Sequence, residues 1–177
     1  MIDGMKTLSQ FFLVVVLMTS LTGCLFKAPV FEEGFSKIDS ALNGVWASEG
    51  ENGDPRKMEF AVCAPLDDDR YVLNHPSAEK GALFYEARLV KVRDRSLLQL
   101  RLLASFHDGV PKADAERYTL LWLEKGPAES GLKVRSLGGD GVKEKGPAEV
   151  KRLLETPGTD WNTLFGEASV YRKLKDK

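Results

Sequence analysis

Short stretches in which apolar and polar residues alternate recur through most of the chain, and they limit what it can fold into. The pattern is clearest at 96–105, where Leu98 and Leu100 share one face. Gln99 and Arg101 share the other face. A period of two residues is typical of a half-buried β-strand. Such stretches predict a mainly β domain with strands at 44–48, 57–64, 70–74, 82–94, 96–105, 117–124, 132–137 and 168–174.

The predicted strands follow one another through short polar turns, as in an antiparallel meander. One of these turns is the glycine-containing acidic run at 49–55. An open sheet leaves unpaired edge strands, and full closure removes them, so we expect an antiparallel barrel of about eight strands. A two-sheet sandwich is the alternative that the same pattern allows.

One predicted strand needs another element to cover it, and one predicted helix can supply that cover. The strand at 117–124 is apolar on both faces, so another element has to cover its outer face. At 147–156, just before the last strand, a helix begins with Pro147 and carries an apolar stripe that includes Val150. We expect this helix to pack on the outside of the barrel, and we expect Asp160 to cap a short turn after it.

Two further expectations concern the inward faces of the strands. In the second strand the alternation places Phe60 and Val62 toward the core and Cys63 on the opposite face. In the fourth strand the alternation changes phase near Leu89 and Val90. Because a slip of one residue reverses every side chain, we expect a β-bulge or a sharp bend there.

Residues 5–24 have the layout of a secretory signal peptide. Lys6 supplies a positive charge, and an unbroken apolar run follows at 11–18. A helix needs roughly 20 apolar residues to span a bilayer, so this run is too short to be a membrane span. Translation begins at Met1 or at Met5, and the sequence leaves this choice open.

The end of this stretch, Leu21-Thr22-Gly23-Cys24, resembles the lipobox of bacterial lipoproteins. The resemblance implies that the peptide is cut before Cys24. The thiol then carries a diacylglycerol, and the new amino group is acylated. Two or more acyl chains anchor a protein stably. The resemblance therefore implies a lipid-anchored protein of the bacterial cell envelope, and Leu25 after the cysteine favours the outer membrane, facing the periplasm.

These features divide the chain into three parts. The signal peptide spans 1–23, a lipidated tether spans 24–36, and a single domain spans 37–177. Pro29 and Gly34 interrupt any regular pattern in the tether. The remaining part is long enough to bury a core of its own.

The opening of the domain resembles a second family. A short helical turn followed by Gly44-Val45-Trp46 is similar to the Gly-x-Trp start of lipocalins and related small barrels. In that family an arginine of the last strand crosses the Trp ring, and Arg172 is the residue placed to do so. A guanidinium over an indole contributes about 0.5–2 kcal/mol. The resemblance implies a lipocalin-like barrel that can accept a small apolar ligand.

No residue pattern predicts catalysis. The two histidines are His75 and His107, and His107 stands close to Ser105 and Asp108. Neighbours this close in sequence do not form a hydrolytic triad unaided, and no Gly-x-Ser-x-Gly motif is present. Two separated histidines and Cys63, the one cysteine that lipidation leaves free, do not indicate a metal site.

We therefore expect a lipid-anchored envelope protein that is not an enzyme and that has no cofactor or metal. The formal net charge of −1 argues against a nucleic-acid partner. The expected partners are the membrane, through the acyl chains, and a small apolar ligand inside the barrel. The alternative is a structural or protein-interaction lipoprotein with a filled core and no ligand.

Overall fold

A computed structural model describes residues 26–48, 58–77, 81–107, 110–112, 117–127, 131–142 and 144–174. The predicted signal peptide and Cys24 lie outside these residues. The described chain contains the strands β1 (Gly44–Ser48), β2 (Phe60–Pro65), β3 (Tyr71–Ser77), β4 (Gly81–Val92), β5 (Arg95–His107), β6 (Val110–Lys112), β7 (Tyr118–Lys125), β8 (Gly131–Leu137) and β9 (Phe165–Lys173). It also contains the helix α2 (Pro147–Glu155) and the 3₁₀ turns η1 (Ser40–Leu42), η4 (Asp140–Val142) and η5 (Trp161–Thr163).

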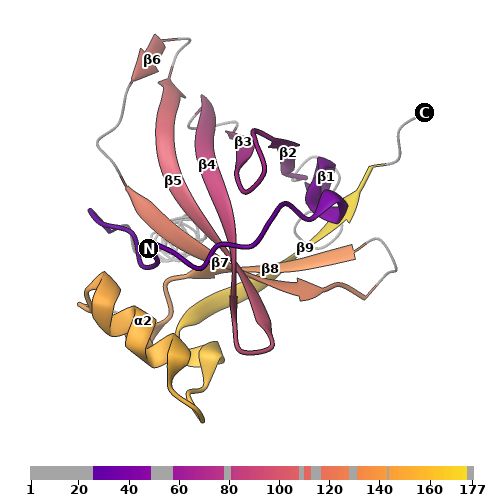
Figure 1. Cartoon of the computed structure of the whole chain (residues 1–177). Coiled ribbons are helices and arrows are strands. Elements are labelled where there is room, and N and C mark those ends of the chain that lie inside the picture. Colours follow the sequence, from indigo (N-terminus) through magenta and orange to yellow (C-terminus); the bar gives the residue numbers. More distant parts are fainter. Residues whose placement is uncertain are drawn as a thin grey trace, which may run out of the picture.

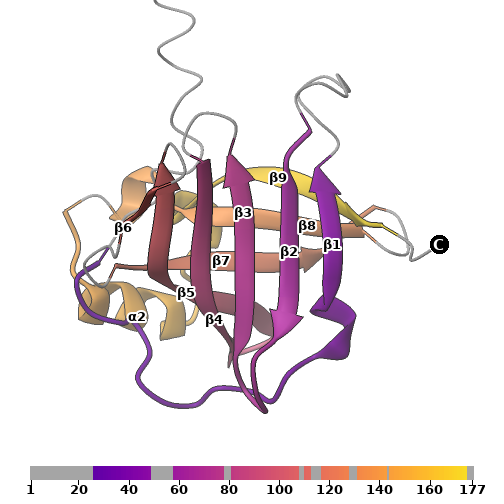
Figure 2. The same ribbon diagram turned by 90° about the horizontal axis from the view of Figure 1, so that it is seen from above.

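Eight of the described strands form a closed antiparallel barrel, which confirms the fold expected from the alternation. The order around the ring is β1, β2, β3, β4, β5, β7, β8, β9, and β9 pairs again with β1. Figure 2 shows β1 to β5 side by side, with β7, β8 and β9 crossing behind them. The short strand β6, which the sequence did not predict, pairs with the far end of β5. Closure of the ring excludes the two-sheet sandwich.

Helix α2 packs on the outside of the barrel, as expected (Figure 1). Its Val150 and Leu154 are fully buried in one cluster with Leu120 and Trp122 of β7. The cap after the helix is also confirmed, because the Asp160 side chain accepts a hydrogen bond from the backbone N–H of Asn162 at the start of η5. In the described parts of the chain, no helix combines the length and the apolar character that a bilayer crossing requires.

Helix α2 and the outside of the barrel share one buried cluster, which we call the outer cluster, and three aromatic rings form its centre. The ring centroids of Trp122, Trp161 and Phe165 lie 5.5–5.7 Å from one another. The guanidinium of Arg95 lies 4.9 Å from the Trp122 ring and 4.6 Å from the Trp161 ring. Aromatic and cation–π contacts at these spacings stabilise the fold beyond the effect of the apolar area that they bury. The outer cluster is thus a second core, separate from the barrel interior.

The predicted tether is not a free linker over residues 26–36, and this expectation is corrected. Phe26 and Tyr118 exchange two backbone hydrogen bonds of 2.8 and 2.9 Å, and Val30 and Phe31 are each only 4% exposed. The buried Gln99 side chain accepts hydrogen bonds from the N–H groups of Val30 and Phe31 and donates one to the carbonyl of Phe31, at 2.8–3.0 Å. Residues 26–35, here called the N-terminal segment, therefore belong to the folded domain.

The phase change at Leu89 and Val90 does not mark a β-bulge, so the bulge expected there is wrong. The pairing of β4 with β5 continues unbroken through both residues, and its register shifts instead between Phe84 and Tyr85. Leu89 belongs to the barrel interior, whereas Val90 belongs to the outer cluster. The strand is apolar on both sides here because both sides are covered.

The inward face of β2 is also the reverse of the expected one. Phe60 and Val62 are 42% and 38% exposed, whereas Cys63 is buried in the barrel interior. The register explains the reversal, because Ala61 pairs with the inward-facing Trp46 and therefore shares its face. A small residue fits opposite this large ring.

Replacing Gln99 with Leu should destabilise the protein by about 2–4 kcal/mol, because two backbone N–H groups and one carbonyl would be left buried without partners. Urea unfolding measures the loss, and hydrogen exchange should show faster exchange at Val30 and Phe31. The control is Leu103→Gln, since this residue of β5 is 39% exposed, with an expected change within about 0.5 kcal/mol. Unchanged stability and exchange in Gln99→Leu would contradict the role of this side chain.

Candidate functional site

Every strand of the closed ring contributes inward side chains to one apolar cluster, which fills the middle of the barrel. The fully buried members include Tyr71 and Ala87. Other members from around the ring are Trp46, Cys63, Leu89, Leu98, Leu100, Leu121, Leu132 and Tyr171. Large aromatic rings from β1, β3 and β9 thus occupy much of the interior volume.

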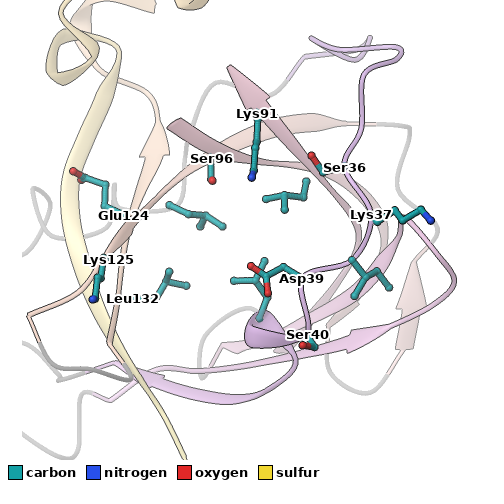
Figure 3. Close-up of a pocket in the computed structure, with 13 residues that line it drawn as sticks. Ser36, Lys37, Asp39, Ser40, Lys91, Ser96, Glu124, Lys125 and Leu132 are labelled. Carbon is teal, nitrogen blue, oxygen red and sulfur yellow. The ribbon is translucent and has the colours of Figure 1, made fainter. Parts of the chain in front are cut away.

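A pocket of about 540 Å³ opens at one end of the barrel, above this filled layer (Figure 3). We call it the mouth pocket. Its apolar lining comes from the interior cluster and consists of Ile38, Leu42, Leu89, Leu123 and Leu132. Its polar lining consists of Ser36, Lys37, Asp39, Ser40, Lys91, Ser96, Glu124 and Lys125. The volume of this pocket lies within the range of small-molecule sites, although polar residues outnumber apolar ones in its lining.

Polar groups face the mouth pocket from two sides. Lys91 of β4 and Ser96 of β5 are directly paired across the strands. Figure 3 shows the Lys91 amine and the Ser96 hydroxyl pointing into the hollow, with the Asp39 carboxylate on the opposite side. The Glu124 carboxylate instead accepts a hydrogen bond from Arg135, at 3.2 Å. Lys91, Ser96 and Asp39 therefore present an ammonium, a hydroxyl and a carboxylate to the pocket above its apolar floor.

One wall of the mouth pocket is formed by residues 36–42, here called the crossing segment, which runs across the end of the barrel. The Trp46 indole N–H donates a hydrogen bond of 2.9 Å to the carbonyl of Leu42. The Tyr71 hydroxyl accepts a hydrogen bond from the Asp39 N–H at 2.5 Å and donates one to the Asp39 carbonyl at 3.3 Å. Interior side chains thus hold the wall of the pocket in place.

Gly44 is the first residue of β1 and Trp46 is buried in the barrel interior, but the basic residue beside the Trp ring is not the expected one. Lys173, not Arg172, lies over the Trp46 ring, with its amine 5.8 Å from the centroid. The register decides this, because Lys173 pairs with Trp46 whereas Arg172 pairs with Ala47 and takes the other face. The expectation for Arg172 is therefore corrected by one position.

Gly44 is favoured chiefly by its backbone conformation, which L side chains rarely adopt. Its φ angle is +130°, and a Cβ added here would lie 2.7 Å from the Lys173 side chain. The Lys173 amine in turn donates a hydrogen bond of 3.2 Å to the carbonyl of Ala41 in the crossing segment. The glycine therefore leaves room for the side chain that joins β9 to the pocket wall.

A second polar group of residues lies on the inner face of β2, β3 and β9. His75 is 7% exposed, and its Nε2 lies 3.7 Å from the Glu59 carboxylate. The Tyr171 hydroxyl donates to the same carboxylate at 3.3 Å. The pKa of Glu59 lies below its usual value, chiefly because of His75, while burial raises the pKa of Tyr171. These residues do not line the mouth pocket.

Cys63 faces the interior as an unreactive thiol. Burial raises its pKa from 9.0 to about 11, which is the opposite of the shift that activates a nucleophilic cysteine. The side chain of His107 and the whole of Asp108 lie outside the described residues. Among the residues that the structure describes, no three His, Cys, Asp or Glu side chains gather as a metal site would require.

The sequence did not reveal the mouth pocket, although one signal for it was present. The phase change at Leu89 and Val90 marks the point where both faces of β4 become covered. Lys91 therefore continues the inward positions of Leu89 and lies, still exposed, at the opening of the pocket. The crossing segment carries no such signal, because its place over the barrel end depends on contacts with residues distant in sequence.

Comparison of the chain with protein-family models, with curated proteins and with solved structures finds no match. The chemistry of the site is therefore interpreted from the residues of this chain alone.

The buried thiol makes stability depend on pH in the alkaline range. Because the folded-state pKa of Cys63 is raised, the unfolded chain loses this proton first, so stability is lost as pH rises from about 9 to about 11. A Cys63→Ser variant lacks this contribution. The difference in unfolding free energy between wild type and variant should change by up to about 2 kcal/mol across that range, in favour of the variant. A difference that stays constant would contradict the raised pKa.

Proposed function

We propose that this protein is a lipid-anchored component of the bacterial cell envelope that binds a small amphipathic ligand in the mouth of its barrel. The observation that carries the proposal is the mouth pocket, because its volume of about 540 Å³ comes with a floor drawn from the barrel interior. Pockets of about 300–1,000 Å³ with mainly apolar walls and few polar groups are the usual small-molecule sites. A ligand in this pocket would cover apolar side chains that otherwise meet water.

The lining favours an amphipathic ligand over the purely apolar one expected from the sequence. Leu89, Leu123 and Leu132 suit an apolar body. Lys91, Ser96 and Asp39 suit a polar head that forms hydrogen bonds at the opening. A bound ligand would shield these groups from water, and its head would have to replace the hydrogen bonds lost to water, so the head would decide which ligands bind.

The proposed location rests on the sequence. The lipobox resemblance ending at Cys24 supports lipid attachment there, and Leu25 supports the outer membrane with the barrel in the periplasm. No catalytic role and no cofactor are part of the proposal.

A second candidate function is protein binding, and an exposed apolar patch favours it. Val45, Phe60, Val62 and Leu174 lie on the outer face of β1 and β2 and at the end of β9, and each is 37–44% exposed. Val45 pairs directly with Val62 and accepts a backbone hydrogen bond from Leu174, so the patch is continuous. A continuous apolar patch on a folded surface often marks an interaction site.

Lipid attachment predicts that Cys24→Ser releases the protein from membranes. Wild-type protein expressed in its bacterial host should enter the detergent phase of a phase-separating detergent extraction, because two or more acyl chains anchor stably. The variant should keep its leader or remain in the aqueous phase, and its mass should lack the diacylglycerol. Cys63→Ser is the matched control and should behave as wild type. Wild-type protein in the aqueous phase without an acyl mass would contradict the proposal.

Ligand binding in the mouth pocket predicts that anilinonaphthalene sulfonate, an anionic amphipathic dye, binds and increases in fluorescence. Leu132→Trp should fill the pocket and weaken dye binding by about tenfold or more, equal to about 1.4 kcal/mol. The matched control is Val62→Lys, which changes the outer patch and leaves the pocket intact.

The two variants separate the two candidate functions. Loss of dye binding in Leu132→Trp alone supports the pocket, whereas loss in Val62→Lys alone supports the patch. Binding that neither variant changes would contradict the proposed ligand site.

A further inference from the structure

The N-terminal segment is hydrogen-bonded to one side of the barrel from its first described residue onward. Phe26 is bridged to Tyr118 by two backbone hydrogen bonds. Four residues later, Val30 and Phe31 are buried and bonded to Gln99. Further along, Phe35 forms a second antiparallel bridge with Val90. The chain is therefore held against the barrel from Phe26 onward.

The proposed lipid attachment site, Cys24, lies two residues before Phe26. Two residues of extended chain span at most about 7 Å. We infer that the acyl chains of Cys24 hold the barrel directly on the bilayer in one orientation, with the side around Phe26 and Tyr118 facing the lipid. This inference rests on the proposed lipidation of Cys24 and extends it from attachment to orientation.

Charged side chains at this side suit a lipid headgroup surface. Lys27 follows Phe26, and Arg117 precedes Tyr118, and both cations are exposed. Because Phe26 and Tyr118 are bridged, these two cations lie beside the point where the chain leads to Cys24. Basic residues close to an anionic membrane surface are attracted to it. The bilayer itself, and not another protein, is therefore the partner of this side.

The opposite side of the barrel then faces away from the membrane. The start of the described chain and the end of β9 lie on opposite sides of the molecule in both Figure 1 and Figure 2. Leu174, next to the end of β9, is 44% exposed and belongs to the apolar patch. In this orientation the patch faces the aqueous compartment.

Energy transfer from single labelled cysteines to a lipid dye tests the orientation. Full-length lipidated protein carrying Cys63→Ser would be labelled with a donor fluorophore at Arg117→Cys or Leu174→Cys. It would then be reconstituted into phosphatidylcholine–phosphatidylglycerol vesicles that contain an acceptor dye on the headgroup. Transfer at position 117 should exceed transfer at position 174 by about twofold or more, because the barrel separates the two labels.

A tether variant provides the matched control without disturbing the fold. Inserting about eight Gly and Ser residues after Leu25 adds a reach of about 15 Å and leaves every contact of Phe26 and Gln99 intact. In this variant the ratio of the two transfer values should fall toward one. A ratio that stays high despite the insertion would show that the short connection is not what orients the barrel.

The outcomes separate this inference from the proposed function. Vesicles that float with bound protein but give equal transfer at both positions, or greater transfer at 174, overturn the orientation and leave lipidation intact. Wild-type protein that does not float with the vesicles overturns both. Greater transfer at 117 that the insertion reduces supports the orientation.

Discussion

At one end of this barrel the sheet is apolar on both faces, and most of the remaining structure follows from the need to cover the outer face. Leu97, Leu120 and Trp122 point outward from β5 and β7, yet each is buried. Helix α2, turn η5 and the N-terminal segment supply the cover. Burial of such side chains contributes roughly 1.5–3 kcal/mol each, so uncovering these three would cost an amount comparable to the whole stability of a typical domain, about 5–15 kcal/mol.

The same stretch of chain that completes this cover goes on to build the candidate site. After the bridge at Phe35, the crossing segment passes over the barrel end and lines the mouth pocket. Trp46 and Lys173 hold it through its backbone carbonyls. One continuous segment therefore covers part of the outer cluster, forms the pocket wall and provides the proposed membrane connection, and a change at Gln99 that loosens this segment would affect all three.

The errors of sequence interpretation share one physical origin. Alternation shows that two faces differ, but it does not show which face is covered when both carry apolar residues. The alternation predicts Val62 in the core, whereas the real interior holds Trp46 opposite Ala61 and has room there only for a small side chain. Likewise Lys173, and not Arg172, is the partner of Trp46, because a shift of one residue in the strand register changes the face on which a side chain lies.

The sequence by itself determined the eight strands, their antiparallel succession, the helix before the last strand and its place outside the barrel, because hydrophobic period and turn chemistry are local properties. Only the tertiary structure decided that residues 26–36 are part of the domain, that Gln99 points into a buried contact and that Lys91 faces a pocket. These outcomes depend on contacts between residues far apart in the chain. Such contacts have no local signature, since they exist only once the barrel has closed.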